Sequence, residues 1–339
     1  MLTIQSYVSL KPYNTFGIEA TARYFVEIDN EQDIQTLYQL PDFQNLPLLI
    51  LGGGSNLLFT QDFGGWVVKI NIKGIEILKE DQQHVWVRVG AGENWHEFVM
   101  YCVERQWAGL ENLSLIPGTV GAAPMQNIGA YGVEIKDTFD HLEAIEIATG
   151  QQHRFDNATC RFGYRDSIFK QEAKGKYIIT NVCFKLNKVP VFNTSYGDIQ
   201  RTLDQMGIKK LSIEAISEAV VRIRRSKLPD PAEIGNAGSF FKNPEIPRSQ
   251  FEQLQMQYPD IPHYPVSAST VKVPAGWLIE QCGWKGKRTG NVGVHTRQAL
   301  VLVNYGGGRG LEIKQLAEKI QASVQDKFGI HLHTEVNIV

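Results

Sequence analysis

One segment near the middle of the chain reads Ile116-Pro117-Gly118-Thr119-Val120-Gly121-Ala122-Ala123-Pro124-Met125-Gln126-Asn127-Ile128-Gly129-Ala130-Tyr131-Gly132. Its many small residues allow the backbone to approach another group closely, and Gln126, Asn127 and Tyr131 add polar side chains. Glycine-rich loops of this length inside a compact protein usually serve a function. The segment therefore predicts a backbone wrapped around a large flat ligand with polar edges, and a purely structural loop is the alternative.

A second glycine-rich segment lies upstream and follows an apolar run. Residues 46–51 are short and apolar enough for a buried strand, which ends in Gly52-Gly53-Gly54-Ser55-Asn56. Backbone amides in such a turn can converge on phosphate oxygens because no side chain stands in the way. We predict a phosphate-binding turn here. A tight turn before Leu57 is the alternative.

The next glycine pair is a weaker signal. Alternation over residues 85–89 predicts a strand, and Gly90-Ala91-Gly92 leads into a predicted amphipathic helix with Asn94 and Glu97 spaced as a capping box. A dinucleotide-binding Rossmann turn needs a third glycine for close packing of helix on strand, but bulky Trp95 occupies that place. The pattern therefore gives little support to a Rossmann fold.

Three segments downstream carry polar candidates. Gly163-Tyr164-Arg165-Asp166-Ser167 contains an arginine whose ordinary explanation is a surface pair with Asp166, and residues 193–198 predict an exposed loop with Tyr196 near its tip. A helix is predicted over residues 212–225 from its apolar spacing. It ends in a basic cluster, and basic residues in a last turn often only complement the helix dipole.

The segment Gly235-Asn236-Ala237-Gly238-Ser239-Phe240-Phe241-Lys242-Asn243-Pro244 combines backbone freedom, a hydroxyl and a cation. We expect Gly238 to present Ser239 to a ligand while the two phenylalanines anchor the segment in a core. A simple chain reversal is the alternative.

The C-terminal residues alternate in polarity and predict a strand. Ile330, Leu332, Thr334, Val336 and Ile338 would share its buried face, so that Glu335 is presented on the other face. His331 and His333 also lie on that face, but without a cluster of cysteines or carboxylates they do not predict a metal site.

The composition limits the class of protein. A chain of 339 residues predicts about two or three domains. With 34 basic and 36 acidic residues it carries no overall charge that would recruit nucleic acid or anionic lipid. Its 4 cysteines form no CxxC pair, and no apolar stretch approaches the length of a membrane span. We therefore expect a cytoplasmic protein.

Taken together, residues 52–56, 116–132, 163–167 and 235–244 and the terminal Glu335-Val336 resemble the UDP-N-acetylenolpyruvoylglucosamine reductases of bacterial cell-wall synthesis. The resemblance covers nearly the whole chain. It implies an α+β protein with an FAD-binding fold of the vanillyl-alcohol-oxidase type in two subdomains, followed by a smaller α+β substrate-binding domain. The implied divisions are residues 1–70 with 329–339, residues 71–227, and residues 228–328.

The resemblance also implies an activity, which is the NADPH-dependent reduction of an enolpyruvyl UDP-sugar to UDP-N-acetylmuramate with non-covalently bound FAD. In this reading Arg165 and Glu335 stabilise the developing charge and Ser239 donates a proton. The implied substrate-binding residues are Tyr164, Tyr196, Lys227 and Asn243. The implied cofactor-binding residues are Gly53, Gly54, Ser55, Asn56, Ile116, Pro117, Gly118, Val120, Gly121, Gln126, Asn127, Gly129, Ala130, Tyr131 and Arg224.

Two other functions compete with this interpretation. A flavin oxidase of the same broad fold would use oxygen, but its usual covalent flavin attachment needs a histidine or cysteine, which the glycine loops lack. A non-catalytic UDP-sugar binding protein would not need Arg165, Ser239 and Glu335 together. The sequence leaves the oligomeric state open and is compatible with a monomer.

Overall fold

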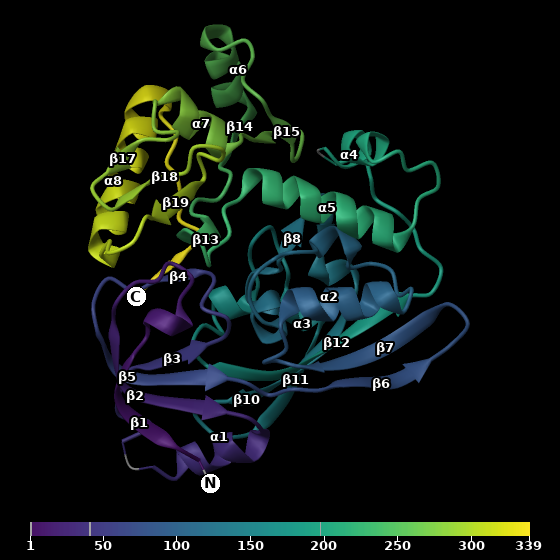
Figure 1. The fold of residues 1–339 in the computed structure, drawn as a ribbon, viewed down its shortest axis with the longest axis vertical. Helices are drawn as coiled ribbons and strands as arrows, with labels where there is room; N and C mark the ends of the chain where they lie inside the picture. The colour runs from purple at the N-terminus through teal and green to yellow at the C-terminus, as the bar shows by residue number, and fades with distance from the viewer. Residues whose placement is uncertain (1, 41, 197) are drawn as a thin grey trace. The chain divides into compact units, whose positions relative to one another are not determined.

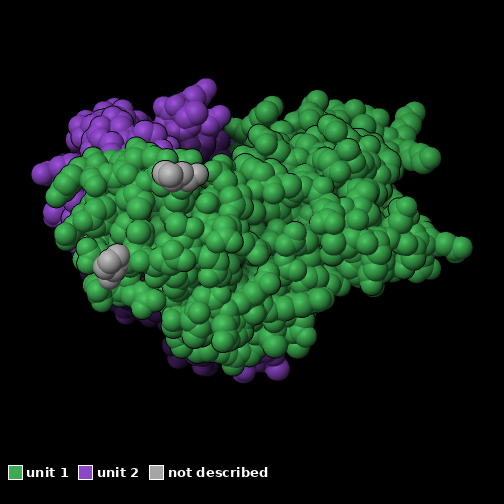
Figure 2. Space-filling model, turned by 90° about the horizontal axis from the view of Figure 1, so that it is seen from below, with its two compact units in different colours: residues 1–8, 22–54, 63–226 green, residues 9–21, 55–62, 227–339 purple. Residues whose placement is uncertain are grey.

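The computed structural model describes residues 2–40, 42–196 and 198–339. Gly197, in the predicted Tyr196 loop, lies outside the described residues. The chain divides into two compact units, which Figure 2 colours separately. Unit 1 comprises residues 1–8, 22–54 and 63–226, and unit 2 comprises residues 9–21, 55–62 and 227–339. The predicted three-part division is finer and stays a prediction.

Unit 1 contains two larger sheets and a short hairpin (Figure 1). The first sheet has the strand order β1-β2-β5-β3, and β5 pairs in parallel with both β2 and β3. The second has the order β11-β10-β12-β7-β6 and is antiparallel. The strands of these sheets are β1 Ile4–Ser9, β2 Thr21–Ile28, β3 Leu48–Leu51, β5 Phe63–Ile70, β6 Ile75–Glu80, β7 His84–Gly90, β10 Phe139–Glu146, β11 Gln152–Asp156 and β12 Tyr177–Asn187, and the hairpin strands are β8 Gly129–Ala130 and β9 Val133–Glu134.

The helices of unit 1 agree with the predicted periodicity. The predicted helix over residues 212–225 is α5 Ile213–Lys227, and the first helix of the unit is α1 Glu31–Tyr38. The capping box of α2 Trp95–Glu104 is present in part, since the Asn94 side chain accepts a hydrogen bond from the Glu97 N–H over 3.1 Å. The remaining α-helices of this unit are α3 Asn157–Cys160 and α4 Ile199–Gln205.

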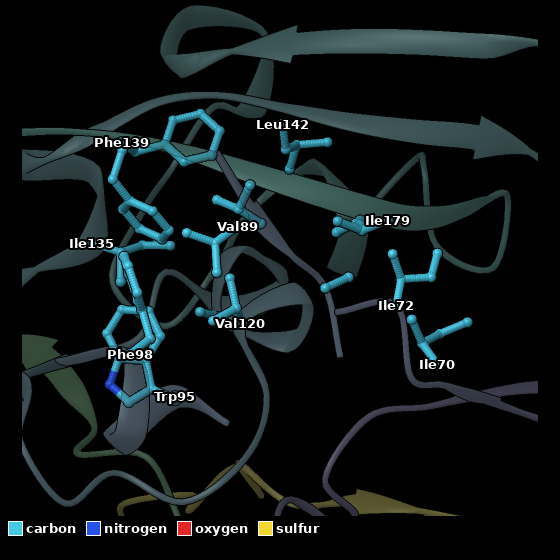
Figure 3. Packing of buried hydrophobic residues seen from close by; sticks show 14 of the residues in the cluster. Ile70, Ile72, Val89, Trp95, Phe98, Val120, Ile135, Phe139, Leu142 and Ile179 are labelled. Atoms are coloured by element: carbon cyan, nitrogen blue, oxygen red, sulfur yellow. The ribbon is translucent and has the colours of Figure 1, made fainter. Parts of the chain in front are cut away.

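A single core joins the two sheets of unit 1. Val85, Val87 and Val89 alternate into it from β7, and Trp95 and Phe98 of α2 are also buried. Figure 3 shows side chains from both sheets and from the glycine-rich loop packed there. Burying a large apolar side chain stabilises a fold by about 1.5–3 kcal/mol, so this core holds the loops at its edge in place.

The antiparallel pairing around β7 excludes a Rossmann fold, which needs parallel strands there. The two glycines after β7 have a packing role instead. A Cβ atom at Gly90 would lie 2.4 Å from the carbonyl oxygen of Ile72, and one at Gly92 would lie 2.5 Å from the backbone of Asn71. Both glycines are needed because another segment passes at backbone distance.

Unit 2 contains three further sheets, of which the largest has the order β13-β19-β18-β17. Helices α7 and α8 pack on each other, and α8 contacts β18 and β19 of that sheet (Figure 1). Gly329 ends α8 with φ 66°, in the left-handed region that glycine adopts without strain. The strands are β4 Leu57–Leu58, β13 Gly235–Ser239, β14 Glu245–Pro247, β15 Tyr264–Pro265, β16 Thr270–Lys272, β17 Arg288–Thr289, β18 Val292–Val294, β19 Val301–Asn304 and β20 Asn337–Ile338, and the helices are α6 Arg248–Gln257, α7 Ala275–Gln281 and α8 Gly310–Phe328.

The predicted C-terminal strand is only partly correct. Ile330, Leu332 and Val336 are buried as expected, but Ile338 is 40% exposed, so its assignment to the buried face was wrong. The physical reason is a change of pairing partner. The chain pairs first with the segment after β13, and then β20 runs parallel to β4. Because the neighbouring segment differs before and after this change, the face that is buried at Ile330 and Leu332 does not stay buried at Ile338.

Candidate active site

Ser239 lies at the end of β13, directly after a β-bulge. Asn236 pairs with Val303, but Ser239 pairs with Val301, so β13 carries one extra residue. Gly238, within the bulge, adopts the left-handed backbone angle φ 68°, and its N–H donates to the Asn236 side chain over 2.9 Å. Bulges of this kind turn a side chain out of the regular alternation. The predicted role of Gly238 in presenting Ser239 therefore has a structural basis.

The residues around the bulge are firmly anchored. Phe240 and Phe241 are 0% and 1% exposed, which confirms that they hold the segment in a core. Asn236 is buried, and its amide donates to the carbonyl oxygens of Ile234 at 2.9 Å and Pro229 at 3.3 Å. These contacts fix the backbone on which Ser239 is carried.

Glu335 is brought to the same segment by backbone pairing. Its N–H donates to the carbonyl of Phe240 over 2.8 Å, and the Lys242 N–H donates to the carbonyl of His333 over 2.9 Å. On the other side, the Asn56 amide donates to the carbonyl oxygen of Glu335 over 3.3 Å. Two predicted catalytic residues, Ser239 and Glu335, and one predicted cofactor residue, Asn56, thus meet in unit 2.

The two glycine-rich loops of unit 1 touch each other. A Cβ atom at Gly53 would lie 2.7 Å from the Cα of Gly118, and one at Gly52 would lie 2.7 Å from the Thr119 side chain. Val120 is fully buried in the core, so its side chain anchors the second loop and only its main chain can face a ligand. Gly52 and Gly53 of the first loop are therefore brought beside Gly118 and Thr119 of the second.

Arg224, half-buried at the end of α5, joins the two ends of the second loop. Its Nε donates to the carbonyl of Leu115 over 3.2 Å, and its guanidinium hydrogen-bonds the Tyr131 side chain. Burial lowers the pKa of Arg224, as does the nearby Arg165, whereas Tyr131 raises it. Burial in turn raises the pKa of Tyr131. A guanidinium within a loop of small residues suits a flat anionic ligand.

His96, which was not among the predicted site residues, fixes the start of the same loop. Its Nδ1 accepts a hydrogen bond from the Leu115 N–H over 3.0 Å. Burial, followed by the charges of Arg225 and Arg224, lowers the pKa of His96. No local pattern marks this histidine, because its partners come from separate segments of the chain.

Arg165 lies in a tight turn and reaches the same glycine-rich loop. Its Nη2 donates to the carbonyl oxygen of Gly129 over 2.6 Å. The neighbouring Asp166 accepts hydrogen bonds from the Gln171 side chain at 3.0 and 3.1 Å. A surface pair between Arg165 and Asp166 does not account for the contact with Gly129.

The predicted substrate-binding residues are distributed over both units. Tyr164 and Tyr196 belong to unit 1, and Tyr196 is 43% exposed beside Gly132, where an added Cβ would lie 3.3 Å from the Tyr196 Cβ. In unit 2, Lys227 is the exposed last residue of α5, and the Asn243 oxygen accepts from the Ala275 N–H over 2.9 Å at the start of α7.

A hollow on the outer face of the second sheet of unit 1 is not part of this site. Several of its charged groups are engaged with one another, as in the 2.7 Å contacts of Arg88 with Glu143 and of His141 with Asp140. This mixture favours no ligand class. The lining residues are Glu76, Leu78, Lys79, Trp86, Arg88, Asp140, His141, Glu143 and Arg154.

Among residues 2–40, 42–196 and 198–339, no helix is both long and apolar enough to cross a membrane. The same residues contain no group of three or more His, Cys, Asp or Glu side chains that could hold a metal ion. His331 and His333 contact each other, with ring centroids 4.9 Å apart.

Comparisons with known proteins agree with this geometry. Residues 22–156 match a family described as "FAD binding domain", and residues 230–339 match "UDP-N-acetylenolpyruvoylglucosamine reductase, C-terminal domain". A solved structure of a UDP-N-acetylenolpyruvylglucosamine reductase from Thermus caldophilus has a TM-score of 0.68 at 24% identity, covering 100% of this chain and 99% of its own. The predicted FAD-binding fold with a smaller α+β domain is confirmed.

Two full-length relatives establish the family. A protein from Amoebophilus asiaticus is 53% identical over 338 residues, and one from Flavobacterium johnsoniae is 52% identical over 339 residues. In both comparisons 100% of this chain and 100% of the relative are covered, and both relatives are named UDP-N-acetylenolpyruvoylglucosamine reductase. This chain belongs to the UDP-N-acetylenolpyruvoylglucosamine reductase family.

Proposed function

We propose that this protein reduces the enolpyruvyl group of UDP-N-acetyl-3-O-(1-carboxyvinyl)-glucosamine to the lactyl ether of UDP-N-acetylmuramate in peptidoglycan precursor synthesis, with NADPH as the electron donor. The names of the full-length relatives support the reaction class. The observation that carries the proposal is the pairing of the Ser239 segment with the Glu335 segment in unit 2. It supplies a proton donor and a carboxyl group on one rigid backbone.

The residues present fit non-covalently bound FAD. Gly53 and Gly118 come so close that their loops can both offer backbone amides to one diphosphate, and Arg224 adds a positive charge beside them. We assign the predicted cofactor-binding residues to this group, with Val120 and Asn127 acting through the main chain. When bound, FAD carries a hydride from NADPH to the substrate.

At the substrate, hydride addition to the methylene carbon places negative charge on the carbon beside the carboxylate. We assign Arg165 and Glu335 to stabilise that charge, and Ser239 to deliver the proton that completes the reduction. A serine hydroxyl is a weak acid in water, but a strongly basic carbon centre accepts its proton readily when the geometry is fixed. The bulge at Gly238 provides such a fixed geometry.

We assign Tyr196 and Lys227 to the substrate diphosphate, and Asn243 and Tyr164 to the rest of the substrate. An ammonium group and a phenol hydroxyl are suitable phosphate donors. The exposed position of Tyr196 beside Gly132 supports a loop that closes over the bound substrate. Closure would keep water away from the reacting carbon.

The setting of the reaction is part of the proposal. The substrate is a soluble UDP-sugar, and we expect the protein to work in the cytoplasm. We also expect three parts, which are residues 1–70 with 329–339, residues 71–227, and residues 228–328. The balance of basic and acidic residues gives no reason to expect nucleic acid or membrane as a partner.

An anaerobic visible spectrum tests the proposal. Flavin bands should bleach when NADPH is added and return when the enolpyruvyl UDP-sugar follows. Return with oxygen but not with the sugar would favour the oxidase, and sugar binding without any return of the bands would favour a binding protein. If the protein shows no flavin bands even after FAD is supplied, the proposal is wrong.

A further inference from the structure

We infer that Asn127 and Ser167 are positioning residues that hold Arg165 in place for the reaction. The inference rests on the proposed function of Arg165 and adds two residues that act through it. Ser167 is not among the predicted site residues, and Asn127 was predicted only as a cofactor residue.

Arg165 has an unfavourable backbone conformation. Gly163 and Asp166 exchange backbone hydrogen bonds of 3.0 and 3.3 Å, which closes a tight turn with Arg165 at its third position. Arg165 adopts φ 53° there, in the left-handed region. Glycine or asparagine is the usual residue at such a position, because a larger side chain strains the backbone. The surrounding structure must therefore hold this arginine in its conformation.

Three hydrogen bonds connect the turn to the glycine-rich loop. The Asn127 amide donates to the carbonyl of Gly163 over 3.0 Å, and the Ser167 hydroxyl donates to the carbonyl of Met125 over 2.7 Å. The third is the 2.6 Å bond from Arg165 to the carbonyl of Gly129. The backbone is thus fixed on both sides of Arg165, and its guanidinium is fixed as well.

Both polar atoms of the Asn127 side chain are engaged in hydrogen bonds. It is fully buried, its oxygen accepts from the Lys136 N–H over 3.2 Å, and its amide also donates to Glu134 over 2.9 Å. Asn127 itself has φ 46°, which asparagine and aspartate tolerate better than other side chains. Asparagine combines that tolerance with an amide donor for the Gly163 carbonyl, whereas the carboxylate of aspartate offers no donor.

The matched variants are Asn127→Asp, Ser167→Ala and, as control, Lys136→Met. Asn127→Asp keeps size and backbone tolerance but loses the donor to Gly163. Lys136→Met removes the 2.7 Å ion pair with Glu134 and leaves the bonds of Asn127 unchanged. The measurements are FAD content, melting temperature and the rates of flavin reduction by NADPH and of reoxidation by the enolpyruvyl UDP-sugar.

We expect Asn127→Asp and Ser167→Ala to slow reoxidation by about tenfold or more, because small displacements of a catalytic group are costly. Flavin reduction by NADPH should stay within about twofold in Ser167→Ala, and Lys136→Met should leave both rates within about twofold. The double variant Asn127→Asp with Glu134→Gln restores a donor between these two side chains. It should recover melting temperature without recovering the reoxidation rate.

The inference is wrong if Ser167→Ala and Asn127→Asp leave reoxidation unchanged, or if Ser167→Ala slows both half-reactions equally. If Asn127→Asp does not fold, Ser167→Ala carries the test. Arg165→Lys distinguishes this failure from that of the proposed function, because an unchanged reoxidation rate in that variant would remove the role of Arg165 itself.

Discussion

The main-chain N–H of Glu335 donates to the carbonyl oxygen of Phe240 over 2.8 Å, so the last residues of the chain pair with the segment that directly follows Ser239. Backbone pairing of this kind sets the spacing between the side chains that the two segments carry. The proton donor and the carboxyl group that we assign to the reaction are therefore positioned by the same strand-like pair.

Replacing Ser239 by alanine should separate the two half-reactions. Reduction of the flavin by NADPH should stay fast, while reoxidation by the enolpyruvyl UDP-sugar should slow by about 10²-fold or more, because only the second half needs the proton. Rapid mixing followed by visible absorbance measures both rates. The exposed Ser269→Ala in the same unit is the control, and an equal loss in both halves of Ser239→Ala would reject the assigned role.

Replacing Tyr196 by phenylalanine removes the hydroxyl that we assign to the substrate diphosphate. The KM for the UDP-sugar should rise by about tenfold, as expected for the loss of one hydrogen bond to a charged group, while the rate of flavin reduction by NADPH stays unchanged. Steady-state and half-reaction kinetics give both values. If neither changes, the loop does not contact the substrate as proposed.

Gly238→Ala tests the bulge below Ser239. No heavy atom lies within 4 Å of an added Cβ, so only the strain at φ 68° counts, and the free energy of unfolding should fall by about 1–2 kcal/mol. Gly310→Ala is the contrast, because its added Cβ would overlap the Phe59 carbonyl oxygen at 1.7 Å. This substitution should lower the free energy of unfolding by more than Gly238→Ala does. Denaturant unfolding measures both losses, and the reverse order would contradict the geometry.

His96 should make the stability depend on pH. Burial, Arg225 and Arg224 lower its pKa in the folded protein, and Glu97 opposes them. The unfolded value is about 6.5, so the neutral form contributes its full stability above that pH. The contribution is lost as the pH falls from about 6.5 towards the lower folded pKa, with a slope of at most about 1.4 kcal/mol per pH unit.

Melting temperatures between about pH 8 and pH 5 measure this effect. His96→Asn is the matched variant, because its side-chain oxygen can still accept the hydrogen bond from the Leu115 N–H while carrying no charge. The wild-type protein should lose more stability than the variant below about pH 6.5. An identical decline in both proteins would assign the acid sensitivity to other groups.

Local patterns in the sequence determined the features that depend on neighbouring residues. The apolar spacing placed α2 and α5, the spacing of Asn94 and Glu97 marked the start of α2, and the aromatic pair after Ser239 indicated its anchor. The glycine-rich segments and the serine segment identified the family, because their small residues and polar groups stand in a fixed order along the chain. Such signals lie within a few residues of one another.

The tertiary structure alone decided the features that depend on distant segments. The left-handed turn at Arg165, the full burial of Asn127 and the place of His96 beside Leu115 follow from contacts that no local pattern encodes. Ile338 is a further example. The alternating pattern predicted that it is buried, but it is exposed because the C-terminal segment changes its pairing partner before β20. Periodicity reports which residues prefer burial, but only the packed chain determines which segment covers them.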